Sequence, residues 1–315
     1  MQAWGAEPLR ANPTLLLIAD GAKDQDDACI WVNPRDGAQS VVIGSDKSGG
    51  KIVVYDLKGR VLQILSVAKP GNIDLRQNVK LDGFAGDLVV VNQRTGGFRL
   101  QVYRIDPESR TLERIDGDHV LTGPNYGGCL FHSRATGKLY FLCTSDAGTV
   151  EQHEIVGNGK GHVSGQLVRS WPLNKCEGAV ADDVTGTFYI AEERGSIWAF
   201  PAEPDQPAKG KRIVSVGDHG ITGDLEGLAI YRGPDHPACL LASDQGRNRF
   251  LMFSLDEPHT LLNEFEVVGA ADSDGIDVTS ANLGPDFPHG LFVCHTNETP
   301  RPLLVTPWQN IARQR

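Results

Sequence analysis

Three aspartates stand within four positions in the stretch KDQDDACIWVNP, residues 23–34. When ionised, Asp24, Asp26 and Asp27 repel one another, so their crowding indicates a site that a bound cation neutralises. Carboxylates are hard oxygen ligands, and Ca²⁺ takes about six to eight of them. Zinc fits poorly, because no histidine or cysteine cluster has the spacing of zinc ligands.

The aspartates precede a short apolar run, and runs of this type recur along the chain. They return at intervals of 45 to 54 residues, each beside one of six residues: Asp27, Asn72, Tyr126, Glu177, Glu226 and Asp274. A second run and a third follow each first run, as in SVVIGSDKSG and KIVVYDL, and Gly, Asn, Asp and Pro separate them. Five units show a fourth run, such as VLQILSV, and TLLLIAD at 14–20 can supply the fourth run of the last unit.

This period predicts an all-β fold, a six-bladed β-propeller with four-stranded blades. Residues 1–315 are expected to form one domain, with the ring closed by an N-terminal strand and residues 1–13 as a loose extension. A β-sandwich with accidental periodicity is the alternative, and the fixed repeat length favours the propeller.

In a propeller the first strands line a central channel and all start at the same rim. That rim would gather acids scattered along the sequence, among them Asp26, Asp27, Asp74, Glu177, Asp224, Glu226, Asp272, Asp274 and Asp277, together with Glu193 and Gln245 from the ends of second strands. A single acid of this kind is usually a solvated turn residue. Recurrence in successive repeats favours a metal-binding ring.

Composition narrows the function further. The formal net charge of −10, from 40 acids and 30 bases, argues against a nucleic-acid partner. No apolar run reaches membrane length and no signal peptide is recognisable. The six cysteines include no CxxC pair, and most lie within apolar runs, which predicts mostly free thiols. Signatures of serine hydrolases, P-loop enzymes and zinc proteases are absent.

Longer segments resemble the β-propeller phytases, which are calcium-dependent phosphatases of inositol hexakisphosphate. DDACIW at 26–31 is similar to the family's D-D-P-A-I-W, and GNIDLR at 71–76 to its N-N-V-D-[IV]-R. CEGAVADDVTGTFYIAEERGSIW, SDGIDVTSANLGPDFPHGLFV and LLVTPWQNIA extend the likeness over 24–312. The resemblance implies several calcium ions at the channel mouth and attack of a calcium-held water on phosphorus without a covalent phospho-enzyme.

The resemblance also implies residue roles. Calcium ligands are expected at Asp26, Asp27, Tyr126, Glu177, Glu193, Asp224, Glu226 and Gln245, and the acidic ring adds Asp274. The expected catalytic residues are Asp27, Glu177, Glu193 and Glu226. Phosphate, bound directly or through calcium, is expected at Lys47, Arg94, Asn72, Asp74 and Tyr126.

Some positions depart from the family pattern. Asp146 stands where members carry a phosphate-binding lysine, and Ala147 where an acid often follows. The segment HTNET at 295–299 replaces Q-D-G-E-N, so Thr296 takes the place of an aspartate in a calcium-binding loop. Ala28, Cys29 and Gly71 are milder changes in the first two motifs.

Two other functions stay open: a lactonase-like calcium-dependent hydrolase and a non-catalytic ligand-binding propeller. The basic pair Lys47 and Arg94 argues against the first, and the complete acidic ring argues against the second. The expected partner is a small anion, phytate or calcium-phytate, with no nucleic acid and no membrane. The protein is expected to be a monomer. It is also expected to be secreted or periplasmic, because family members are usually exported.

Overall fold

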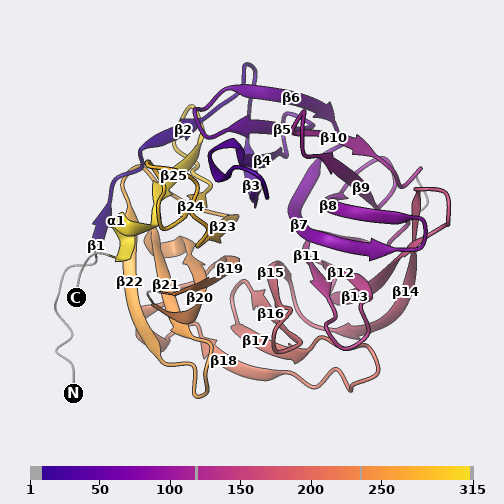
Figure 1. Cartoon of the computed structure of the whole chain (residues 1–315). Coiled ribbons are helices and arrows are strands. Elements are labelled where there is room, and N and C mark those ends of the chain that lie inside the picture. Colours follow the sequence, from indigo (N-terminus) through magenta and orange to yellow (C-terminus); the bar gives the residue numbers. More distant parts are fainter. Residues whose placement is uncertain (1–8, 118–119, 235, 313–315) are drawn as a thin grey trace.

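The protein is described by a computed structural model over residues 9–117, 120–234 and 236–312. Within these ranges nearly all regular structure is β-strand, arranged in six sheets around a central channel (Figure 1). Each sheet is a blade in which the strand that begins the repeat lies innermost. The predicted six-bladed β-propeller is confirmed.

In every blade the strands of one repeat pair antiparallel, in chain order from the channel outwards. The first blade comprises β3 (Gln25–Trp31), β4 (Val41–Asp46), β5 (Lys51–Asp56) and β6 (Val61–Ser66), and the second β7 (Pro70–Leu81), β8 (Phe84–Gln93), β9 (Arg99–Asp106) and β10 (Thr111–Arg114). The third comprises β11 (Gly127–His132), β12 (Leu139–Thr144), β13 (Thr149–Gly157) and β14 (Val163–Pro172), and the fourth β15 (Cys176–Asp182), β16 (Thr187–Glu192), β17 (Ser196–Pro201) and β18 (Lys211–Ser215). The fifth comprises β19 (Leu225–Gly233), β20 (His236–Asp244), β21 (Arg249–Ser254) and β22 (Leu261–Val267), and the sixth β23 (Ile276–Thr279), β24 (Leu291–Cys294) and β25 (Leu303–Pro307).

The N-terminal segment closes the ring as predicted. Strand β2 (Leu15–Leu17) pairs antiparallel with β25 and completes the sixth blade, with Leu15 opposite Val305. The expectation of a loose extension over 1–13 is wrong for part of that range, because β1 (Leu9–Ala11) adds a parallel fifth strand to β22. Residues 1–8 of that predicted extension lie outside the described residues.

The core lies between neighbouring blades. Successive side chains of β4 point to opposite faces, so Val42 packs towards the sixth blade while Val41 and Ile43 pack towards the second. Both faces of a middle strand are therefore buried, and this explains why the second and third runs read as continuous apolar stretches rather than alternating ones. One apolar cluster fills each of the six interfaces between blades.

The remaining regular elements are short. They are three 3₁₀ turns, η1 (Gly37–Gln39), η2 (Asp218–Gly220) and η3 (Gln245–Arg247), and the helix α1 (Trp308–Ala312). Trp308 of α1 stacks on Tyr231 at a ring distance of 4.0 Å, which fastens the C-terminal segment to the fifth blade. All six cysteines are buried free thiols, as predicted. Among the described helices, none combines the length and apolar character needed to cross a bilayer.

Candidate metal and phosphate site

An acid–glycine pair stands within the first three residues of two inner strands and directly before a third: Glu177–Gly178, Glu226–Gly227 and Asp274–Gly275. Neighbouring pairs touch through their backbones, since the Gly227 N–H donates to the carbonyl oxygen of Asp274 at 2.9 Å. A Cβ atom at Gly178 would lie 2.0 Å from the carbonyl oxygen of Glu226, and one at Gly227 would lie 2.3 Å from that of Asp274. Only glycine permits this approach, which draws the acids of successive blades together.

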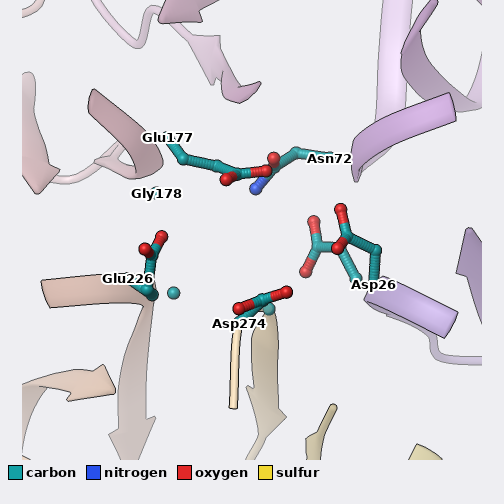
Figure 2. Close-up of a pocket in the computed structure, with 9 residues that line it drawn as sticks. Asp26, Asn72, Glu177, Gly178, Glu226 and Asp274 are labelled. Carbon is teal, nitrogen blue, oxygen red and sulfur yellow. The ribbon is translucent and has the colours of Figure 1, made fainter. Parts of the chain in front are cut away.

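The acids converge on a cavity at the channel mouth. Its lining consists of carboxylates, one amide and glycines: Asp26, Asp27, Asn72, Glu177, Gly178, Glu226, Gly227, Asp274 and Gly275. Figure 2 shows the carboxylates of Glu177, Glu226 and Asp274 directed towards the middle of the channel, facing Asp26 across it. The sequence-predicted ring of acids is therefore formed by side chains from four blades.

Two of these acids form a tighter group with Glu193, which we call the glutamate triad: Glu177, Glu193 and Glu226. One carboxylate oxygen from each lies within 4.8 Å of the other two, and all three residues are buried. The Oε1 atom of Glu193 and the Oε2 atom of Glu226 are buried without a hydrogen-bond partner, as is Oδ1 of Asn72 nearby. Buried acceptors are rarely left unpaired, so these oxygens fit the ligand shell of a hard divalent cation.

The electrostatics of the cavity agree with this fit. Burial, together with the neighbouring carboxylates, raises the pKa of Glu226 well above its usual value and the pKa of Asp274 to about 8. Burial also raises the pKa of Glu177 and that of Asp27. Asp26 differs, because Arg94 and Lys47 outweigh the effect of burial and hold its pKa below the usual value. Acids that resist ionisation in this way would be stabilised as carboxylates by a bound metal ion.

The two predicted phosphate-binding cations lie inside the ring. Lys47 Nζ pairs with Asp26 and lies 3.7 Å from Asp274 Oδ2, whereas Arg94 Nη2 pairs with Glu177 and lies 3.5 Å from Asp26 Oδ2. Their side chains are only 21% and 5% exposed, respectively. Both cations therefore serve as counterions for the acids and are not solvated turn residues.

Tyr126 lies beside this basic pair. The Cζ atom of Arg94 is 4.3 Å from the centroid of the Tyr126 ring, and the Nζ atom of Lys175 is 5.1 Å from the same centroid. Burial, with Glu177 close by, raises the pKa of Tyr126 to about 12. Its hydroxyl is protonated at neutral pH and can donate a hydrogen bond to an anion.

Comparison with known proteins connects this geometry to a family. The model of the phytase family matches residues 11–302. The chain belongs to the phytase family. It is also 38% identical over 316 residues to a 3-phytase of Bacillus subtilis (strain 168). This alignment covers 94% of this chain and 82% of that protein.

Solved structures support the fold alone. A calcium-binding protein, regucalcin, from Agrobacterium tumefaciens matches 96% of this chain and 97% of its own with a TM-score of 0.58 at 11% identity. An auxiliary nutrient binding protein from Bacteroides thetaiotaomicron matches with a TM-score of 0.58 at 10% identity, and the match covers 93% of this chain and 75% of that protein. Such low identities carry no information about the reaction of this phytase-family chain.

Three further predicted site residues, like Lys47, Arg94, Tyr126 and Glu193, are not among the residues that line the mouth cavity: Asp74, Asp224 and Gln245. Asp74 lies farther along the channel, where its carboxylate accepts a hydrogen bond from the Leu130 N–H at 2.8 Å and pairs with Arg76 at 3.0 Å. Asp224 pairs with the exposed Arg194 at 3.1 Å. Gln245 is closer to the site, since its side-chain amide donates to Asp274. Asp74 thus connects the second and third blades of this phytase-family chain and does not line the mouth cavity.

Lys175 was not predicted from the sequence. It lies between β14 and β15, and its Nζ atom is 2.7 Å from Glu193 Oε2. A signal was present, because Lys175 stands two positions before the acid of the pair Glu177–Gly178. Its contact with Glu193 depends on the pairing of separate loops and could not be read from spacing.

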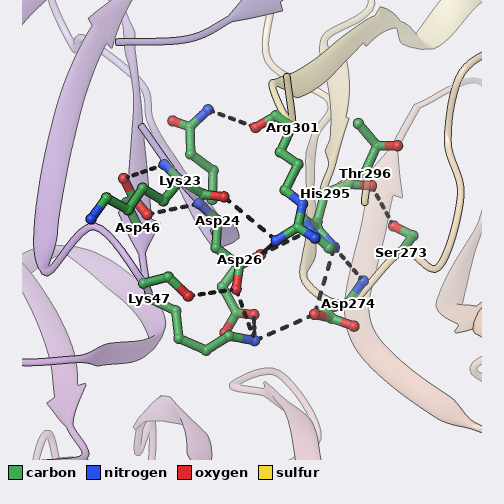
Figure 3. Close-up of polar contacts among 12 residues, drawn as sticks. Lys23, Asp24, Asp26, Asp46, Lys47, Ser273, Asp274, His295, Thr296 and Arg301 are labelled. Atoms are coloured by element: carbon green, nitrogen blue, oxygen red, sulfur yellow. Dashed lines mark hydrogen bonds and ion pairs between the residues drawn. The ribbon is translucent and has the colours of Figure 1, made fainter. Parts of the chain in front are cut away.

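Thr296, which stands where the family pattern has an aspartate, is held by hydrogen bonds to the backbone. The Thr296 hydroxyl donates to the carbonyl oxygen of Gly269 at 2.7 Å and accepts from the Ala271 N–H at 3.1 Å. Nearby, Arg301 Nη1 lies 3.1 Å from Asp24 Oδ1, so a protein cation neutralises that acid (Figure 3). Hydrogen bonds and an arginine thus organise the segment in which the phytase family was expected to place an aspartate ligand.

Proposed function

We propose that this chain is a calcium-dependent phytase, a phosphomonoesterase that releases phosphate from inositol hexakisphosphate. The observation that carries the proposal is the glutamate triad, which holds carboxylate oxygens within 4.8 Å of one another, buried and incompletely hydrogen-bonded, in a chain of the phytase family. The 38% identical relative is a 3-phytase, which supports the same reaction here.

Calcium fits the mouth cavity better than other common metals. The available donors are carboxylate and amide oxygens, and histidine and cysteine are absent from the described lining, which disfavours zinc and copper. The ions would be held by the glutamate triad together with Asp26, Asp27 and Asp274. Bound calcium would neutralise phosphate oxygens and make a water molecule more acidic, as hydrolysis without a covalent phospho-enzyme requires.

Residues of the chain position the substrate. Arg94 and Lys47 are neutralised by Glu177 and Asp26, and once those acids have another counterion the two cations can offer N–H donors to a phosphate. The protonated hydroxyl of Tyr126, in contact with Arg94, adds a neutral donor at the same edge of the cavity. These donors would orient the phosphate above the triad.

The cavity lining also supports water as the nucleophile. No serine, threonine, cysteine or histidine is among the described residues that line the mouth. Burial raises the pKa of thiols such as Cys129 and Cys143, which lie in the apolar clusters between blades. A hydroxyl or thiol nucleophile of the usual kind is therefore not placed to attack a phosphate there.

Family membership over residues 11–302 favours a phosphatase over a lactonase-like hydrolase or a non-catalytic propeller. Export to the periplasm or the medium, and a monomeric state, stay part of the proposal. Cell fractionation with an antibody against the chain tests the first, and light scattering of the purified protein tests the second.

The deciding experiment measures phosphate release from phytate by protein stripped of metal, with calcium then titrated back. We expect no release in chelator and a calcium-dependent rise to full activity, whereas magnesium at the same concentration should substitute poorly because it prefers a smaller octahedral shell. Full activity in chelator, with metal removal verified by elemental analysis, would contradict the proposal.

A further inference from the structure

We infer that Lys175 is a phosphate-binding residue at the outer edge of the mouth cavity, where it receives an incoming phosphate monoester together with Tyr126 and Arg94. The inference rests on the proposed function for its substrate, but its basis is the placement of charge around the mouth.

The first observation is accessibility. Arg94 and Lys47 have side chains that are 5% and 21% exposed, and each is held by acids of the ring. The Lys175 side chain is 50% exposed while its ammonium group remains 2.7 Å from Glu193 Oε2, a member of the triad. Of these three cations, Lys175 is the most exposed, so its ammonium group can contact an anion arriving from solvent at the smallest desolvation cost.

The second observation is continuity with the inner cations. Lys175 Nζ and Arg94 Cζ lie 5.1 and 4.3 Å from the centroid of the same Tyr126 ring. Lys175, the Tyr126 ring and Arg94 therefore form one contiguous group, and Arg94 in turn pairs with Glu177. A phosphate dianion bound along this group would lie next to the triad, where hydrolysis is proposed to occur.

The third observation concerns the backbone that carries Lys175. The residue belongs to the segment that connects the third and fourth blades, and its carbonyl oxygen accepts from the Glu193 N–H of the fourth blade at 3.2 Å. The segment also runs beside the loop that contains Asp146, because the Cys176 N–H donates to the Ser145 carbonyl oxygen at 3.2 Å and the Leu173 N–H to that of Gly148 at 3.3 Å. Asp146 is exposed, so a lysine at that position would extend from a loop adjoining Lys175.

The test uses four variants. Lys175→Gln removes the charge, Lys175→Arg keeps it, and the double variant Lys175→Gln with Asp146→Lys restores a cation from the adjoining loop. Lys138→Gln is the matched control, because Lys138 is also about half exposed (52%) and pairs with a glutamate at 3.0 Å, but lies at the opposite end of β12 from the mouth.

Two quantities are measured at saturating calcium: the kinetics of phytate hydrolysis, and the dissociation constant of myo-inositol hexasulfate, a non-hydrolysable polyanion, by calorimetry. We expect Lys175→Gln to raise KM and the dissociation constant about tenfold, with kcat changed less than twofold. Lys175→Arg and the double variant should recover most of the loss, and Lys138→Gln should match the wild type.

Two outcomes would overturn the inference: wild-type KM and hexasulfate binding in Lys175→Gln, or a fall in kcat with unchanged KM, which would mean that Lys175 only steadies Glu193. Failure of the proposed function gives a different pattern. If the wild-type chain releases no phosphate from phytate with calcium, the proposed reaction is wrong, and hexasulfate binding by the variants still decides whether Lys175 binds the anion.

Discussion

At the scale of single residues, the site is defined by opposite charges held close together. Glu177 illustrates this: its carboxylate belongs to the triad, pairs with Arg94 and lines the mouth cavity. Burial raises its pKa, although Arg94 opposes that effect. A carboxylate kept in such surroundings is expensive for folding unless it has a ligand, which makes Glu177 a residue for function more than for stability.

Replacing Glu177 with glutamine should separate these two roles. The variant keeps an oxygen that can accept from Arg94 but loses the charge that binds calcium, so we expect kcat for phytate to fall by about two orders of magnitude or more. The melting temperature without calcium should change little, because a buried charge is removed while Asp26, 3.5 Å from Arg94, remains as a counterion for the arginine. Steady-state kinetics and circular dichroism measure both effects. Near-normal turnover by the folded variant would refute a ligand role for Glu177.

Asp277 provides a residue-scale prediction about pH. Burial, with Asp74 nearby, raises its pKa to about 7, while its Oδ2 accepts from the Ile30 N–H at 2.8 Å. The folded state thus retains a proton that the unfolded chain releases near pH 4, so stability falls as pH rises from about 4 to 7, by up to about 1.4 kcal/mol per pH unit.

Asp277→Asn removes this titration while leaving an acceptor for Ile30. In chelator, the melting temperature of the variant should decline less between pH 5 and pH 8 than that of the wild type. Thermal denaturation at several pH values makes the comparison, and parallel declines would show that Asp277 does not titrate in this range.

At the scale of strands, the inner edge of each blade both carries the acids and joins its neighbour. Asp27 Oδ2 accepts from the Ile73 N–H at 3.0 Å, as Asp74 and Asp277 do from their own neighbouring blades. The acid–glycine pairs set the distance between adjacent inner strands. Sequence periodicity alone could not distinguish acids that join blades from acids that face the mouth.

Gly178→Ala tests the spacing of the inner strands. The added Cβ would meet the Glu226 carbonyl oxygen at 2.0 Å, so the fourth and fifth blades must separate locally. We expect a loss of about 1 to 3 kcal/mol in stability, as for other overpacked sites, and a weaker affinity for calcium because Glu177 and Glu226 move apart. Denaturant unfolding and calcium titration by calorimetry measure the two effects, and an unchanged calcium affinity would show that the triad tolerates the shift.

The same strands show which features of the protein could be predicted from its sequence. The six repeats and the closing strand β2 were predictable because turn residues and apolar runs recur with a fixed period. The acids of the mouth were predictable because every inner strand starts at one rim. The pairing of Lys175 with Glu193 within the fourth blade, and of Arg301 with Asp24 between the sixth and first blades, was not, because these contacts depend on side-chain conformations that local sequence does not specify.

At the scale of the whole molecule, the ring brings together charges that the chain disperses. The mouth receives Asp26 from the first blade, Asn72 from the second, Glu177 from the fourth, Glu226 from the fifth and Asp274 from the start of the sixth. Apolar clusters between all six pairs of blades hold the ring closed against this repulsion. Calcium would relieve the repulsion, so metal binding and global stability should be coupled.

The coupling gives the last prediction. A ligand that binds only the folded state stabilises it by RT ln(1 + [L]/Kd), about 2.7 kcal/mol at a hundredfold excess over Kd. Removing calcium from the wild type should therefore lower the melting temperature by several degrees. Glu226→Gln should behave differently: it loses a ligand and also a buried charge, so its melting temperature in chelator should equal or exceed that of the wild type and respond weakly to added calcium. Scanning calorimetry of both proteins, with and without calcium, makes the comparison, and equal responses to calcium would place the stabilising ion away from the glutamate triad.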